Sequence, residues 1–222
     1  MSFGLSRGRE QSIEGYGFLA ADLPTGPPAE PPPAVDPRAW FERPDRPFEI
    51  EIGSGKGTFL VQYAATQPEV NHLGIEWAGE FFRYAADRIR RHAMENVRML
   101  HADAVEFLRW RCPDGIARVI HLYFSDPWPK SRHHKRRVVQ DESLAVFHRL
   151  LEPRGELRIV TDHDDLWAWY EEHAERNAHL FERTVFVPPA SAGEGELVGT
   201  NYERKFVPEG RNLRAMTLVR KD

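Results

Sequence analysis

The sequence has 222 residues, of which 41% are hydrophobic and 29% are charged. A chain of this size and composition can bury one large core, which excludes a small disulfide-stapled scaffold and a wholly disordered chain. The formal net charge of −4 does not exclude a nucleic-acid partner, because the basic residues, most of them arginine, can still gather on one face.

The compartment is indicated by three features of the chain. Its single cysteine, Cys112, cannot form an internal disulfide. No apolar run is long enough to cross a membrane, and the first residues lack the apolar stretch of a secretory signal. We therefore expect a cytoplasmic protein.

The amino-terminal part is interrupted by proline. Nearly every second residue between Leu23 and Pro37 is proline, which removes backbone donors and fixes φ, so neither a helix nor a central strand is expected there. We predict that residues 1–37 form an arm and a flexible proline-rich linker, and that residues 38–222 form the folded domain.

From Phe48 onward, short apolar strands alternate with amphipathic helices. Strands are predicted at residues 48–53, 72–77, 96–100, 117–124, 156–162, 183–187 and 213–219. Helices are predicted between them, ending near Gln67 and at 78–94, 104–111 and 142–151, with another ending near Asn177. This alternation predicts an α/β protein with a Rossmann-like, mostly parallel sheet covered by helices on both faces.

Ligands of such sheets bind beyond the carboxyl ends of the strands, so the residues that follow each strand are the candidates for chemistry. Gly53 and Gly55 follow the first strand, where glycines let a ligand approach the backbone, although a tight turn without a ligand is the alternative. Glu76 ends the second strand and could bind a ribose. Asp103 follows the third strand and could accept from an adenine amino group, cap the next helix, or do both. Glu51 lies within an apolar strand and needs a partner.

The segment after the fourth strand, Phe124 to Arg137, is the most informative. Asp126, two prolines and Trp128 form a stiff ledge suited to a planar base. The basic run that follows would be repulsive without phosphates or acids nearby, although a solvated surface is the usual explanation of such a run. Adjacent histidines diverge, so His133 and His134 do not predict a metal site.

Two later segments each allow two interpretations. The residues around Asp162 follow the fifth strand and could cap a helix whose Trp167 and Trp169 are predicted to be core or interface residues. The run Thr200, Asn201, Tyr202, Glu203 fits a helix capping box. Alternatively, Glu203 could accept from the N1 and N2 protons of a guanine.

Taken in order, the motifs EIGSGKG, GIEW, FSDPWPKSRHHKRR, TDHD and TNYERK closely resemble the tRNA (guanine-N7-)-methyltransferase family, over about Phe48 to Phe206. Arg7-Gly8-Arg9 is similar to the basic start of family members. The resemblance implies a seven-stranded S-adenosylmethionine-dependent methyltransferase fold, with a guanosine in the variable loop of tRNA as the target. It implies tRNA as the partner, while the residues themselves predict neither a metal nor a membrane.

The resemblance also implies the roles of individual residues. The cofactor site would comprise Glu51, Gly53, Gly55, Glu76, Asp103 and Asp126, with Asp126 as the catalytic residue. The substrate would contact Lys130, Asp162, Thr200, Asn201, Tyr202 and Glu203. The RNA would lie along Arg132, His133, His134, Lys135, Arg136 and Arg137.

Two rival functions remain open. An adenine N6 methyltransferase would also use an Asp-Pro-aromatic ledge, but Asp126-Pro127-Trp128 lacks the extra proline that this chemistry usually favours. An RNA-binding module without activity would be expected to lose the acidic cofactor residues, and all four are present. The glycine spacing and the basic run disfavour a nicotinamide dehydrogenase.

Overall fold

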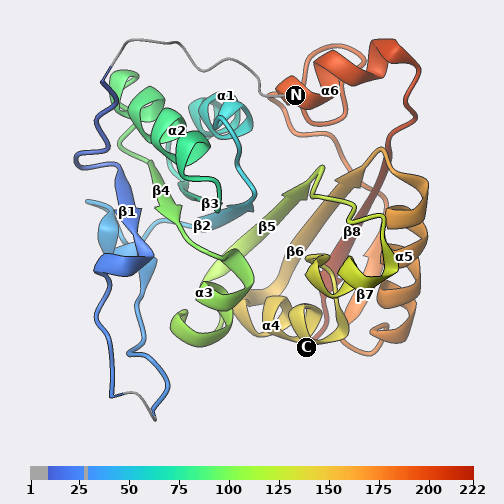
Figure 1. The fold of residues 1–222 in the computed structure, drawn as a ribbon, viewed down its shortest axis with the longest axis horizontal. Coiled ribbons are helices and arrows are strands. Elements are labelled where there is room, and N and C mark those ends of the chain that lie inside the picture. Colours follow the sequence, from blue (N-terminus) through green and yellow to red (C-terminus); the bar gives the residue numbers. More distant parts are fainter. Residues whose placement is uncertain (1–9, 28–29) are drawn as a thin grey trace.

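The computed structural model describes residues 10–27 and 30–222, which are built around one eight-stranded sheet (Figure 1). Its strand order is β1-β4-β3-β2-β5-β6-β8-β7. The strands are β1 (Gly17–Leu19), β2 (Phe48–Ile52), β3 (Asn71–Glu76), β4 (Val97–His101), β5 (Ala117–Tyr123), β6 (Leu151–Thr161), β7 (Phe181–Thr184) and β8 (Arg214–Arg220). Pairings from β1 to β6 are parallel, whereas β8 is antiparallel to both its neighbours. The predicted α/β, mostly parallel sheet is confirmed.

Helices cover both faces of the sheet, as expected for parallel strands joined by crossovers. They are α1 (Thr58–Thr66), α2 (Gly79–Arg91), α3 (Ala104–Arg111), α4 (Asp141–Leu150), α5 (Asp164–Arg176) and α6 (Asn201–Phe206). The largest core cluster joins the sheet to α3, α4 and α5, and two smaller clusters join it to α1 and α2. Among the described residues, no helix has both the length and the apolar character needed to cross a bilayer.

Strand β2 shows how one strand serves both layers. Successive side chains of a strand alternate between faces, and Ile50 and Ile52 belong to the core under α3 to α5. Glu49 therefore faces the side of α1, where its buried carboxylate accepts from Arg118 and from the ring of His121, the latter at 2.8 Å. Although burial alone would raise the pKa of Glu49, the His121 hydrogen bond and nearby positive charge lower it to about 2. The sheet therefore contains a buried carboxylate beneath α1, paired with the half-buried guanidinium of Arg118.

The amino-terminal segment differs from the prediction, because residues 17–19 form the edge strand of the sheet. Gly17 lies opposite Met99 in parallel register, and the Met99 N–H donates to the Tyr16 carbonyl at 2.8 Å. Phe18 stacks on Trp40 with ring centroids 4.2 Å apart. The expected separation of residues 1–37 from the domain is therefore wrong for this part of the arm, and seven predicted strands become eight. Arg7-Gly8-Arg9 lies outside the described residues.

Candidate functional site

A cavity of about 1640 Å³ opens where β2, β3, β4 and β5 end. Single small-molecule sites usually enclose about 300–1,000 Å³, so this cavity has room for a cofactor and a nucleotide together. Its lining brings together twelve predicted residues: Glu51, Gly53, Gly55, Glu76, Asp103, Asp126, Lys135, Arg136, Arg137, Thr200, Asn201 and Tyr202. The predicted residues that do not line it are Lys130, Arg132, His133, His134, Asp162 and Glu203.

The glycine-rich loop between β2 and α1 needs its glycines. Gly53, Gly55 and Gly57 have φ values of 78°, 53° and 66°, a region that other residues rarely adopt. A Cβ on Gly53 or Gly55 would meet nothing within 4 Å, so conformation, not crowding, requires glycine there. The loop therefore presents bare backbone to the cavity.

Glu76 holds this loop in place. One carboxylate oxygen accepts from the Gly55 N–H at 2.8 Å, and the other accepts from the Ala78 N–H at 2.7 Å. A carboxylate oxygen can accept more than one hydrogen bond, so each retains capacity for a ligand hydroxyl. Glu76 is thus fixed in orientation and still able to bind.

Glu51 is buried beside the loop, and its Oε2 has no hydrogen-bond partner within the described part of the chain. Ser54 donates to the Glu51 backbone carbonyl at 3.3 Å. Burial raises the pKa of the Glu51 carboxyl to about 8, and the neighbouring Glu76 adds to the rise. An unpaired buried carboxylate is costly, so the site favours a positively charged ligand at this point.

Asp103 caps α3, as one interpretation of the sequence predicted. Its Oδ1 accepts from the Glu106 N–H at 3.1 Å. The side chain is also exposed and lines the cavity, which leaves its second oxygen accessible to a ligand. The two predicted roles of Asp103 are therefore compatible.

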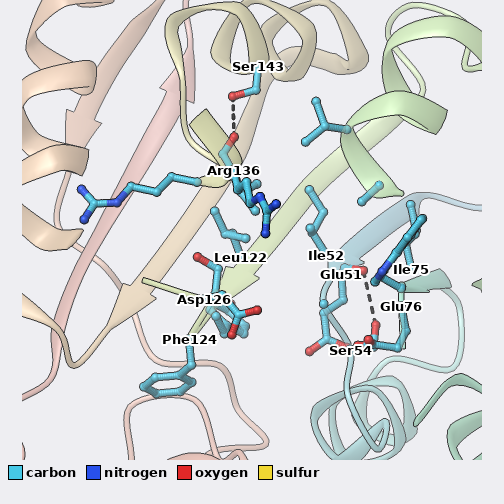
Figure 2. A pocket seen from close by; sticks show the side chains of 18 of the residues that line it. Glu51, Ile52, Ser54, Ile75, Glu76, Leu122, Phe124, Asp126, Arg136 and Ser143 are labelled. Atoms are coloured by element: carbon cyan, nitrogen blue, oxygen red, sulfur yellow. Dashed lines mark hydrogen bonds between the residues drawn. The ribbon is translucent and has the colours of Figure 1, made fainter. Parts of the chain in front are cut away.

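Asp126 stands on the opposite side of the cavity from Glu51 and Glu76 (Figure 2). The residues two before and two after it, Phe124 and Trp128, have φ values of 53° and 43°. Aromatic residues seldom adopt this left-handed conformation, which costs about 1–3 kcal/mol each and is common at functional sites. We call residues 124–129 the ledge, and the Asp126 side chain that it carries is exposed.

The basic run forms a short 3₁₀ helix, η3 (Ser131–Arg136), which the sequence did not predict. Arg132, Lys135 and Arg136 are exposed. The Arg136 guanidinium lies over the Trp128 ring, 4.9 Å from its centroid, and so joins η3 to the ledge. These cations remain available to phosphates.

Arg137, which follows η3, is buried, unlike these neighbours. Its Nε donates to the Pro127 carbonyl at 2.9 Å, and its guanidinium lies 4.9 Å from the centroid of the Trp169 ring. The expectation that Arg137 lies along an RNA does not fit this burial.

Helix α6 closes one side of the cavity. Thr200 caps it by accepting from the Glu203 N–H at 3.0 Å, as the capping-box interpretation predicted. Asn201 donates to Thr58 Oγ1 at 2.7 Å, and the Tyr202 hydroxyl donates to Asp162 at 3.1 Å. These bonds tie α6 to the start of α1 and to the end of β6.

The Glu203 carboxylate does not complete the capping box and points away from the cavity. It is buried and accepts from the backbone N–H groups of Leu197, Val198 and Gly199, the last two at 3.0 and 2.8 Å. Three amides already occupy this carboxylate, so its geometry does not favour the guanine-edge role that the resemblance implies.

Several aromatic residues of the lining were not predicted as site residues, among them Trp77 and Phe206. Trp77, whose exposed fraction is 72%, directly follows Glu76, and Phe206 ends α6. Trp77 could have been predicted from the sequence, because it is an aromatic residue directly after an acidic residue, Glu76, at the end of a predicted strand. Phe206 carries no comparable signal, because only the fold of residues 197–211 brings it to the cavity.

Comparison with known sequences places the chain among methyltransferases. A family described as "Putative methyltransferase" matches residues 45–216. The tRNA (guanine-N(7)-)-methyltransferase of Geobacillus thermodenitrificans (strain NG80-2) is 34% identical over 188 residues, covering 82% of this chain and 85% of that protein. The protein of the same description from Streptococcus thermophilus (strain CNRZ 1066) is 33% identical over 169 residues, covering 76% and 78%.

Solved structures share the fold at low identity. The aminoglycoside resistance methyltransferase NpmB1 has a TM-score of 0.51 and 19% identity, covering 79% of this chain and 87% of that chain. Phosphoethanolamine N-methyltransferase 2 of Haemonchus contortus, in complex with S-adenosyl-L-methionine, has a TM-score of 0.53 and 13% identity, covering 80% of this chain and 49% of that one. Since the family model spans most of the sequence and curated relatives exceed 30% identity over most of both chains, the chain belongs to the tRNA (guanine-N(7)-)-methyltransferase family.

Proposed function

We propose that this protein transfers a methyl group from S-adenosyl-L-methionine to N7 of a guanosine in the variable loop of tRNA, forming 7-methylguanosine in the cytoplasm. The observation that carries the proposal is one cavity that is lined by Glu51, Glu76, Asp103 and Asp126 together, beside the basic η3. The descriptions of the curated relatives support the same reaction.

The residues at the strand ends fit this cofactor. Glu76 is oriented by two backbone amides and retains acceptor capacity for the ribose hydroxyls. Asp103 has an accessible oxygen for the adenine amino group. The unpaired Oε2 of Glu51 would pair with the positive charge of the methionine part.

The mechanism follows from the acceptor atom. S-adenosyl-L-methionine supplies an electrophilic methyl group on a sulfonium. Guanine N7 has a lone pair and no proton, so Asp126 need not act as a base. Asp126 would instead orient the guanine and offset the positive charge that the purine gains, which is an electrostatic contribution. In-line placement of N7 by the ledge would supply most of the acceleration.

The target base must reach this cavity. N7 lies on the major-groove side of guanine, and in a folded tRNA this side of the base is often engaged in tertiary contacts. We therefore expect the nucleotide to be drawn out of its stack, as in other base-modifying enzymes. A bound complex with the guanine still stacked would count against this step.

The first test is incubation of the purified protein with methyl-labelled S-adenosylmethionine and unmodified tRNA transcript, followed by nucleoside mapping. Label in 7-methylguanosine of the variable loop is the expected result. Label in N6-methyladenosine would replace the proposed reaction with the rival one. Cofactor binding without transfer would favour an RNA-binding role.

The role of Asp126 is tested separately with Asp126→Asn. The amide keeps the shape and removes the charge, so we expect the single-turnover rate to fall by about 100-fold with little change in cofactor affinity. An unchanged rate would remove Asp126 from the chemistry.

A further inference from the structure

We propose that Arg137 is a positioning residue for methyl transfer: it clamps the ledge that carries Asp126 and does not bind RNA. The inference rests on the proposed function, because it assigns a role within that reaction. It gives Arg137 a different role from the exposed cations of η3, with which it was predicted to contact RNA.

The clamp begins at the carbonyl next to Asp126. The Arg137 Nε donates to the Pro127 carbonyl at 2.9 Å, while the guanidinium lies over the Trp169 ring of α5 at 4.9 Å. The indole of Trp169 is itself fixed, because its Nε1 donates to the Val139 carbonyl at 2.7 Å. Arg137 therefore connects the ledge to a helix that packs against the sheet.

A second bond holds the other side of Asp126. Ser125 Oγ and the Tyr170 hydroxyl lie 2.7 Å apart, and Tyr170 is buried next to Trp169 on α5. The residues immediately before and after Asp126 are thus both tied to consecutive residues of one helix. This places Asp126 between two anchors, while its own carboxylate remains exposed to the cavity.

The ledge needs such anchors because its backbone is strained. Phe124 and Trp128 hold positive φ values that cost free energy, and conformations of this kind persist only where surrounding contacts enforce them. If the Pro127 carbonyl lost its donor, the strain at Trp128 could relax and carry Asp126 away from the base. A displacement of about 1 Å in a reacting group can cost about 100-fold in rate.

Burial distinguishes Arg137 from a phosphate ligand. Its exposed fraction is 4%, and its planar group is already used in a hydrogen bond and a stacking contact. Lysine can supply the charge but cannot reproduce the flat, stacked group together with the Nε donor. Arg137→Lys therefore separates geometry from charge.

The test compares Arg137→Lys with Arg132→Ala, an exposed cation of η3, in methylation of tRNA. For Arg137→Lys we expect a 10- to 100-fold lower single-turnover rate at saturating substrates, with the tRNA dissociation constant and its salt dependence within two-fold of wild type. For Arg132→Ala we expect the opposite result: the tRNA dissociation constant should rise, and it should depend less steeply on salt concentration. Millimolar methylguanidinium should partly restore the rate of Arg137→Ala.

Two further variants keep the test decisive if Arg137→Lys is unstable. Arg98→Lys removes another buried guanidinium, one that donates to the carbonyls of Trp40, Glu95 and Val97 far from the ledge. It should lower the melting temperature without lowering the single-turnover rate. Tyr170→Phe removes only the hydroxyl that faces Ser125, and should lower the rate several-fold while leaving tRNA affinity unchanged.

The two proposals fail differently. If wild type transfers no methyl group to tRNA, the proposed function fails, but hydrogen exchange still tests the clamp. Arg137→Lys should speed exchange at the amides of residues 124, 125, 126 and 128 and leave exchange in β2 and β3 unaltered. If wild type is active but Arg137→Lys keeps its rate and loses tRNA affinity or salt dependence, Arg137 is an RNA ligand and the inference is overturned.

Discussion

We expect the buried carboxylate of Glu51 to make cofactor binding dependent on pH. Burial holds its pKa at about 8, so the free protein carries a proton there at pH 6 and 7. The sulfonium and ammonium of S-adenosylmethionine would bind better to the ionised form, because opposite charges attract strongly where water is excluded. We therefore predict that cofactor binding releases this proton, and that Glu51→Gln abolishes the release.

The magnitude follows from proton linkage. A group with a pKa near 8 is about 90% protonated at pH 7, so binding should release about 0.9 proton there. If the bound carboxylate stays ionised, the dissociation constant should fall about 50-fold between pH 6 and pH 8 and level off above it. Glu51→Gln keeps the size of the side chain but cannot ionise. The variant should therefore bind the cofactor more weakly, and its dissociation constant should lack the pH dependence that Glu51 contributes.

The assay is titration calorimetry of wild type and Glu51→Gln in two buffers of different protonation enthalpy. The α-amino group of the cofactor also titrates near pH 7.7–8.0. Because this titration affects both proteins equally, it cancels in the ratio of the wild-type dissociation constant to that of Glu51→Gln. S-adenosylhomocysteine, which lacks the sulfonium charge, should show a weaker pH dependence. Absence of proton release at pH 7, or the same slope in both proteins, would refute the reasoning.

The same pKa has a consequence for folding. In the unfolded chain this carboxyl returns to its ordinary value of 4.5, so the protonated form favours the folded state. That stability is fully present below pH 4.5 and is lost as the pH rises through 8. Relative to Glu51→Gln, the cofactor-free wild type should lose about 2–3 kcal/mol of unfolding free energy between pH 6 and pH 9, and urea unfolding would measure it.

Three further predictions concern the surroundings of the site. Arg132→Ala should reduce the slope of log Kd against log salt for tRNA by about one; an unaltered slope in filter binding would show that η3 is only a solvated surface. Glu203→Ala should lower the unfolding free energy by about 2–4 kcal/mol, because three backbone N–H groups lose their acceptor. A urea midpoint equal to that of wild type would contradict this. Glu49→Gln should lower the unfolding free energy by about 1–3 kcal/mol by the same measurement, since the buried carboxylate loses its hydrogen bonds with Arg118 and His121; a fully stable variant would show that these bonds add nothing.

Local signals predicted most of the fold. The strand and helix pattern from Phe48 onward carries its own periodicity, so seven strands and the helices α1 to α5 were recoverable without contacts. The caps Asp103 and Thr200 were also predicted, because capping depends on a few adjacent residues. The rule that ligands bind at strand ends then placed Glu51, Glu76, Asp103 and Asp126 at one edge of the sheet.

The remainder depends on contacts between distant residues. Strand β1 has only three residues and becomes a strand only through β4, so the prolines that follow it were the stronger local signal. Arg136 is exposed and Arg137 is buried, and a run of basic residues does not predict this difference. The burial of Arg137 depends on its contacts with Trp169 and the Pro127 carbonyl. The three N–H donors to Glu203 come from a turn that no sequence motif predicts.

The position of β1 also determines when one edge of the sheet can be covered during synthesis. In the described sheet, β1 pairs with β4 and with no other strand, and it precedes β4 in the chain. It therefore has no strand to pair with until Val97–His101 has been made. Closing such a long loop is entropically costly, and contacts distant in sequence form late. Without β1, the edge of β4 would present unpaired backbone groups to which a neighbouring chain could add a strand. Strand β1 therefore protects this edge of the sheet from aggregation once β4 has been made.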